Sequence, residues 1–130
     1  MAMLSFNAPG EREKSLWLVK KETNPNHSQW YIDRFKAMAA EGNDMAGESR
    51  MGNALASRGA KILDAGSGPG RVGKQLHALG HRVTGVDIDP ELIEEARRVC
   101  PDATWITADL VDRPEVLGIE GDATAEYGFE

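Results

Sequence analysis

The sequence predicts an open, doubly wound α/β sheet in which parallel strands alternate with helices. Two observations predict it. Short apolar or β-branched runs alternate with segments of helical periodicity, and each run leads into a glycine cluster or an acidic residue. Strands that alternate with helices of about ten residues pair in parallel through right-handed crossovers. The length of 130 residues fits a single domain with one core.

Composition excludes several classes of protein. Hydrophobic residues make up 41% of the chain and charged residues 28%, which is typical of a globular domain and not of disorder. The formal charge of -6 disfavours nucleic acid as a general partner. The single cysteine, Cys100, cannot form an intrachain disulfide and indicates a cytoplasmic protein. No export signal and no run approaching roughly 20 apolar residues is present, so no membrane insertion is expected.

Residues 1–58 are predicted to form an N-terminal arm followed by helices. The polar stretch 1–26 contains two prolines and one apolar island at Leu16–Val19, a pattern typical of an extended arm with a short ordered piece. Between Ser28 and Glu41 apolar residues recur at spacings of three and four, which predicts an amphipathic helix. A second helix is predicted from about Met45 to Ser57.

Residues 59–130 are predicted to continue the same domain as its α/β portion. Helices are expected after the first strand, where apolar spacing stops at Gly80, and after Asp89, an N-cap residue followed by proline. We assign Asp89 no chemistry beyond this cap. The acidic end from Glu115 to Glu130 is predicted to be a solvated loop. The three predicted strands are Lys61–Asp64, Arg82–Asp87 and Thr104–Ala108.

The first predicted strand ends in an acidic residue and a glycine-rich loop. In a doubly wound sheet, ligands lie outside the carboxyl ends of the strands, so strand ends identify the site. Alternate glycines let a ligand lie against bare main chain, and the Asp64 carboxylate would attract a positive group such as an amine and repel a phosphate. The candidate binding residues here are Asp64, Gly66, Ser67, Gly68 and Gly70.

The second and third strand ends are also acidic. Asp87 can accept hydrogen bonds from both hydroxyls of a ribose, and Ile88 offers an apolar face to a base. Asp109 offers a carboxylate to an exocyclic amine, and Leu110 a backbone N–H to a ring nitrogen. Together the three strand ends outline adenine, ribose and a charged tail.

An alternative interpretation is a dinucleotide site, because residues 68–73 also satisfy the G-x-G-x-x-G pattern. A pyrophosphate requires backbone N–H donors at a helix N-terminus. Pro69 removes one donor and Asp64 adds a nearby negative charge. Both features disfavour NAD and FAD.

Three segments carry a resemblance to a known family. Ile62–Arg71 resembles the first motif of class I S-adenosylmethionine-dependent methyltransferases, Val86–Leu92 the second, and Thr107–Leu110 the third. Their order and spacing match over roughly residues 61–112, and the preceding helices are similar to the family's helical cap. One such motif alone is a weak indication, whereas three in order are specific.

The resemblance implies a Rossmann-like sheet that binds S-adenosyl-L-methionine and serves methyl transfer. Asp64 and the glycine loop would then lie near the methionine moiety, Asp87 would bind the ribose, and Asp109 with Leu110 would contact adenine. No metal is implied. The acceptor and the catalytic residues stay unidentified. Two alternatives remain open: a fragment of an NAD- or FAD-linked oxidoreductase, and a module that binds the cofactor without catalysis.

The resemblance also implies that the sheet is truncated after about three strands. In the family, strand one is flanked by strand two and strand four, so we expect its outer edge to be unpaired here. An open parallel edge invites association. We therefore expect self-association through that edge, or a longer parent polypeptide, and no efficient turnover by this chain alone.

Two further groups of residues are left outside the site. Trp30, Tyr31 and Arg34 could form a lid, but aromatic residues at helical spacing are usually core, and we interpret them so. The three histidines lack ligand spacing and predict no metal site.

Overall fold

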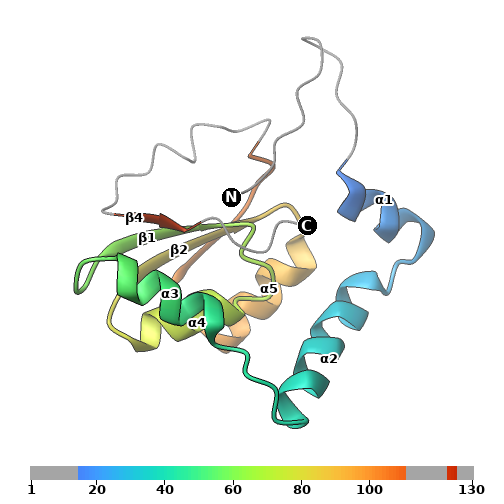
Figure 1. Cartoon of the computed structure of the whole chain (residues 1–130). Helices are drawn as coiled ribbons and strands as arrows, with labels where there is room; N and C mark the ends of the chain where they lie inside the picture. The colour runs from blue at the N-terminus through green and yellow to red at the C-terminus, as the bar shows by residue number, and fades with distance from the viewer. Residues whose placement is uncertain (1–14, 111–122, 126–130) are drawn as a thin grey trace.

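The computed structural model describes residues 15–110 and 123–125 and has the predicted α/β architecture (Figure 1). Four parallel strands form one sheet in the order β3-β2-β1-β4. In Figure 1 the helices α3, α4 and α5 lie on one side of this sheet, while α1 and α2 stand apart from it beside α5. The strand order reverses at β1, which is where a doubly wound sheet holds its ligand.

Three of the four strands were predicted. They are β1 (Lys61–Ala65), β2 (Arg82–Asp87) and β3 (Thr104–Thr107). Apolar and β-branched residues fit the pleated surface between two covered faces. In the register of β1 and β2, Ile62 lies opposite Val83 and Asp64 opposite Gly85.

The expectation of an open edge on β1 is wrong. A short strand, β4 (Ala123–Ala125), pairs in parallel with β1, with Ile62 opposite Ala123 and Asp64 opposite Ala125. Three small residues in an acidic stretch are too few for an alternating pattern to predict a strand, so only the pairing with β1 reveals it. The self-association argument therefore loses its physical basis. The rest of the predicted acidic loop lies outside the described residues.

The N-terminal helices agree with the sequence at their centres and differ at their ends. The helix α2 (His27–Ala40) and the helix α3 (Gly47–Leu55) confirm the two predicted helices within a few residues. The apolar island belongs to a helix of its own, α1 (Leu16–Thr23), where Ser15 caps the N-terminus by accepting a hydrogen bond from the backbone of Trp17. None of the helices in the described ranges has the length and apolar composition that spanning a bilayer requires.

The crossover helices bury apolar residues against one face of the sheet. The helix α4 is Arg71–Ala78 and α5 is Pro90–Val99, which begins at the predicted N-cap Asp89. The cluster on the α4 side is Ala60, Ile62, Val72, Leu76 and Val83. The cluster beneath α5 is Ile93, Ala96, Cys100 and Trp105. A third cluster, Leu63, Val86 and Ala108, packs residues that alternate with these along the strands.

Packing against Trp105 explains why two core positions are occupied by glycine. Its indole lies against Gly73 in α4 and Gly85 in β2, where an added Cβ would come within 2.7 Å and 2.3 Å of the ring. The indole N–H donates to the carbonyl of Cys100 at 2.8 Å, which fixes the ring in place. Gly73, the last glycine of the G-x-G-x-x-G match, is therefore required by core packing.

Gly85→Ala should destabilise the fold by about 3 kcal/mol, because the indole of Trp105 must shift within a packed core. Gly47→Ala is the matched control, since an added Cβ there meets nothing within 4 Å. Urea unfolding of both variants measures the difference. Equal stability of the two variants would show that Trp105 does not require glycine at position 85.

Candidate functional site

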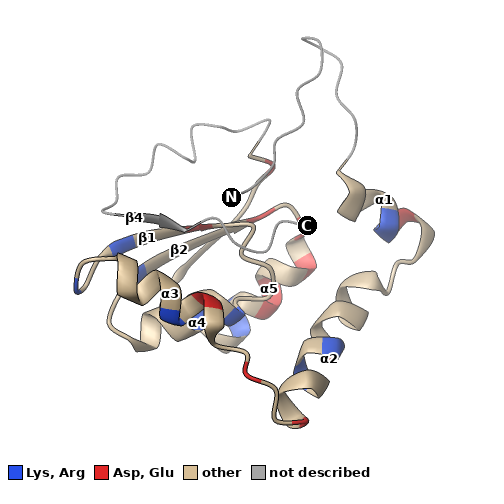
Figure 2. Cartoon of the chain, in the orientation of Figure 1, with Lys and Arg blue, Asp and Glu red and all other residues tan. Residues whose placement is uncertain are grey.

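Charge is distributed unevenly along the central strands. The strands β1 and β2 begin with the exposed basic residues Lys61 and Arg82 and carry Asp64 and Asp87 near their carboxyl ends. Figure 2 shows blue at the start of β1 and red where β2 runs into α5. The carboxyl end of the sheet is therefore acidic, and its field favours a cationic ligand over a phosphate.

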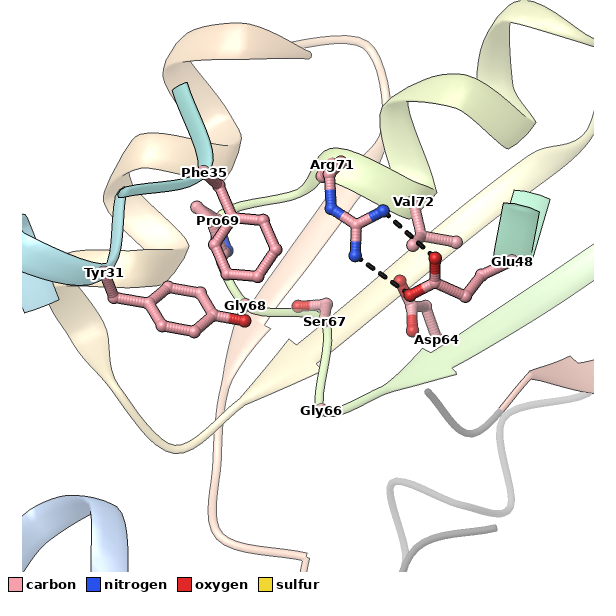
Figure 3. Close-up of a pocket in the computed structure, with 10 residues that line it drawn as sticks. All are labelled: Tyr31, Phe35, Glu48, Asp64, Gly66, Ser67, Gly68, Pro69, Arg71 and Val72. Atoms are coloured by element: carbon pink, nitrogen blue, oxygen red, sulfur yellow. Dashed lines mark hydrogen bonds and ion pairs between the residues drawn. The ribbon is translucent and has the colours of Figure 1, made fainter. Parts of the chain in front are cut away.

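Asp64 is a buried carboxylate that faces a pocket. Its side chain is 1% exposed, and neither oxygen has a hydrogen-bond partner. It lines the pocket together with Glu48 and the loop that follows β1 (Figure 3). Burial raises the pKa of Asp64 to about 7, and the nearby charge of Asp87 adds to the shift. A buried acid without a partner is poised to receive a donor or a cation from a ligand.

The glycine loop forms the floor of the pocket, and its own backbone donors are occupied. The N–H groups of Gly66 and Ser67 both donate to the carbonyl of Val86, at 2.8 Å and 2.9 Å. Gly70 donates to the carbonyl of Ser67 at 3.3 Å, and Pro69 has no N–H. The Ser67 hydroxyl, by contrast, is buried in the pocket without a partner.

Asp87 lies against the same loop. One oxygen, Oδ2, accepts the Gly68 N–H at 2.9 Å, and the other, Oδ1, accepts the Asp89 N–H at 2.9 Å. Burial raises the pKa of Asp87 above its ordinary range, although these backbone donors act in the opposite direction. Each oxygen keeps further lone pairs with which it can accept from a ligand hydroxyl.

The third strand end is joined to the second rather than to the pocket. The N–H of Ala108 donates to the carbonyl of Asp87 at 2.9 Å. Asp109, Leu110 and Ile88 are half-buried beside these strand ends, and Leu110 packs on the cluster of Leu63 and Val86. Of the predicted site residues, the structure places Asp64, Gly66, Ser67 and Gly68 around one pocket, with Asp87 in contact through Gly68.

Tyr31 and Phe35 form the roof of the pocket, which sequence analysis missed. Both project from α2 toward the glycine loop (Figure 3). Their ring centroids are 4.7 Å apart. The interpretation of the aromatic group as core was wrong: Trp30 is 49% exposed, and Arg34 stacks on it at the surface. The four-residue spacing of Tyr31 and Phe35 was the available signal, but a helical stripe does not reveal what it faces.

Arg71 holds the far wall of the pocket in place. Its guanidinium donates to both oxygens of Glu48, at 3.2 Å and 2.9 Å, and to the carbonyl of Met45 at 2.8 Å (Figure 3). It also lies over the Phe35 ring, 5.2 Å from its centroid. The hydrogen bonds from Arg71 lower the pKa of Glu48, so this wall stays ionised. No group of His, Cys, Asp and Glu that could hold a metal ion occurs within the described ranges.

The comparisons with known proteins agree with this geometry. Residues 62–121 match the family described as methyltransferase domain. A TehB-like S-adenosylmethionine-dependent methyltransferase from Corynebacterium glutamicum has a similar structure, with 52% sequence identity and a TM-score of 0.65. The match covers 67% of this chain and 47% of that one. Over these residues the chain is similar to S-adenosylmethionine-dependent methyltransferases.

Curated members of the methyltransferase family match over shorter stretches. A ubiquinone biosynthesis O-methyltransferase from Xanthomonas campestris pv. campestris is 33% identical over 89 residues, which is 59% of this chain and 37% of that protein. A trans-aconitate 2-methyltransferase from Escherichia coli is 41% identical over 51 residues, 38% of this chain and 20% of that protein. The chain spans less than half the length of these relatives and of the C. glutamicum protein.

The buried acid at position 64 should make stability depend on pH. Because its folded pKa of about 7 lies above the unfolded value near 3.8, folding favours the protonated form. The stability that Asp64 contributes is complete below about pH 4 and is lost as pH rises through 7. The loss is roughly 4 kcal/mol, at about 1.4 kcal/mol for each unit between the two pKa values.

Asp64→Asn removes the titration and keeps the shape of the side chain. The free energy of unfolding of the wild type minus that of the variant should therefore fall between pH 4 and pH 8. Urea titrations across this range measure the difference, and other carboxylates cancel because both proteins contain them. A difference that stays flat would mean that Asp64 is ionised at an ordinary pKa.

Proposed function

We propose that this chain forms the S-adenosylmethionine-binding part of a methyltransferase. The observation that carries the proposal is the pair of buried, unpartnered groups in the pocket, the Asp64 carboxylate and the Ser67 hydroxyl. Leaving such groups without partners costs free energy, which a ligand that supplies an amine and an acceptor would recover. The methionine end of S-adenosylmethionine carries an ammonium and a carboxylate, and so fits both.

The other strand ends suit the nucleoside part of the same molecule. In this proposal Asp87 accepts the ribose hydroxyls, Ile88 packs on the base, and Asp109 with the Leu110 backbone meets the adenine edge. Half-burial of Ile88, Asp109 and Leu110 next to Asp87 supports this assignment. Gly66, Gly68 and Gly70 keep the loop thin beneath the ligand.

The hydrogen bonds of the loop argue against a dinucleotide. The N–H groups of Gly66, Ser67, Gly68 and Gly70 are all engaged within the protein, and the carboxylate of Asp87 already occupies the donor of Gly68. A pyrophosphate would have to displace that carboxylate while approaching a second one, Asp64. No observation favours the oxidoreductase alternative.

When bound, S-adenosylmethionine supplies a sulfonium methyl group, which passes to a nucleophile by in-line displacement as the thioether leaves. The residues described here would bind and orient the donor, and proximity is the main catalytic contribution of such a site. The acceptor is not assigned. Relatives named for ubiquinone biosynthesis and for trans-aconitate both resemble this chain, so the resemblance does not indicate one acceptor.

The protein should bind S-adenosylmethionine and S-adenosylhomocysteine in preference to NAD and FAD. Binding to the folded state alone raises the melting temperature, so thermal unfolding at equal ligand concentrations gives the order of affinity. Calorimetry then supplies dissociation constants. A larger rise with a dinucleotide than with either sulfur nucleoside would overturn the proposal.

Ser67→Ala separates ligand binding from folding. Because the hydroxyl has no partner within the protein, its removal should leave the stability of the ligand-free protein unchanged or slightly higher. Affinity for S-adenosylmethionine should fall about 5-fold, which corresponds to roughly 1 kcal/mol for one neutral hydrogen bond. Calorimetry on this variant is compared with Ser57→Ala, an exposed position outside the pocket. Unchanged affinity would remove Ser67 from the site.

A further inference from the structure

Asp89 makes far more contacts than a helix cap requires. Its side chain is 0% exposed and accepts the backbone N–H of Glu91 at 2.9 Å, which is the cap itself. It also accepts hydrogen bonds from the Trp17 indole at 2.5 Å, from the Lys21 ammonium at 2.7 Å, and from the Ser28 hydroxyl. These three donors come from α1 and α2, more than 60 positions away in sequence.

The charge of Asp89 is compensated where it lies. Burial acts to raise its pKa, but the donors from Lys21, Ser28 and Trp17 reverse this effect and lower it. Lys21 also pairs with Glu91 at 2.9 Å, so one ammonium bridges the first turn of α5. A buried ion pair with this many hydrogen bonds fixes geometry, and removing one partner leaves the other uncompensated.

The backbone of Asp89 reaches the floor of the pocket. Its N–H donates to Oδ1 of Asp87, whose other oxygen holds the Gly68 N–H. One residue thus connects the N-terminal helices to the carboxylate that we assign to the ribose. Movement of the Asp89 side chain would be transmitted to Asp87 across a single hydrogen bond.

The residues that donate to Asp89 also position the roof of the pocket, Tyr31 and Phe35. Ser28 is one helical turn from Tyr31 and two turns from Phe35, so anchoring it sets the position of both rings along α2. The Trp17 ring, fixed at its N–H, packs edge-on against Tyr31 with centroids 5.1 Å apart. Roof and floor of the pocket therefore share one anchor.

We propose that Asp89 is a positioning residue for the cofactor site, which couples the helices α1 and α2 to the ribose carboxylate Asp87. This inference rests on the proposed function. Coupling of this kind is reciprocal. A ligand in the pocket stabilises α1 and α2 against opening. Loosening of α1 and α2, in turn, lowers the affinity for the ligand.

The test compares Asp89→Asn with Cys100→Ala in the full chain. Asparagine keeps an oxygen for the cap but loses the charge that binds Lys21 and the capacity for four donors. Cys100 is buried at the other end of α5, away from the pocket, and its substitution serves as the control for lost stability. Two readouts are taken where all proteins are folded: calorimetric affinity for S-adenosylhomocysteine, and hydrogen exchange of residues 16–40 with and without it.

Asp89→Asn should bind S-adenosylhomocysteine at least about 10-fold more weakly, and the ligand should no longer slow exchange in residues 16–40. Cys100→Ala should retain the affinity and the protection of the wild type. A folded Asp89→Asn protein with both properties intact overturns the positioning role. If the wild type binds neither S-adenosylhomocysteine nor S-adenosylmethionine, the proposed function fails, and the role of Asp89 in binding fails with it.

Ser28→Ala provides the second variant should Asp89→Asn not fold. It removes one donor, and it keeps the charge of Asp89, the pair with Lys21 and the helix cap. Affinity should fall about 3-fold, and exchange in α2 should speed up before ligand is added. Unchanged affinity together with unchanged exchange would contradict the coupling.

Discussion

A buried carboxylate, Asp64, and a half-buried one, Asp87, at adjacent strand ends are the constraint to which the rest of the site is fitted. Burial raises the pKa of both carboxyls, and the charge of Asp87 raises the pKa of Asp64 further. Asp87 receives two backbone donors, whereas Asp64 receives none. The protein therefore stabilises the carboxylate that shapes the loop, and the other is the one that we propose meets the ligand. A buried carboxylate without a partner is costly, and a positive group that paired with it would lower that cost.

The glycines illustrate how one sequence pattern can have two physical causes. The G-x-G-x-x-G match could not decide between cofactors because a regular expression does not record what each glycine faces. Gly68 contributes its N–H to Asp87, and Gly73 makes room for the Trp105 ring. Neither role involves a phosphate. Packing and internal hydrogen bonding therefore account for the resemblance to a dinucleotide fingerprint, and the charge of Asp64 is a reason for our proposal that the site disfavours a pyrophosphate.

Much of the fold, and the floor of the site, could be predicted because the signals are local. Strand β2 was predicted at both ends, since a β-branched run ends at an acidic residue and a proline follows. The roof could not be predicted in this way. Tyr31 lies on a helix that is anchored through Ser28 to Asp89, a contact across more than 60 positions that leaves no periodic trace. Strand β4 was missed for a related reason, because pairing with β1 and not composition makes it a strand.

The backbone N–H groups of the loop after β1 support the proposal that it binds a positively charged group. A phosphate site at a helix N-terminus works by offering free N–H groups in a concave array. Here the carbonyl of Val86 accepts two of those groups, Asp87 accepts a third, and Pro69 removes another. The groups that face the pocket are the Asp64 carboxylate, the Ser67 hydroxyl, the rings of Tyr31 and Phe35, and the Arg71–Glu48 ion pair, whose charges offset one another. Carboxylates and ring faces both attract positive charge. The backbone architecture is shared with dinucleotide sites. The groups that face the ligand differ, because an acceptor carboxylate stands where a dinucleotide site offers free N–H donors.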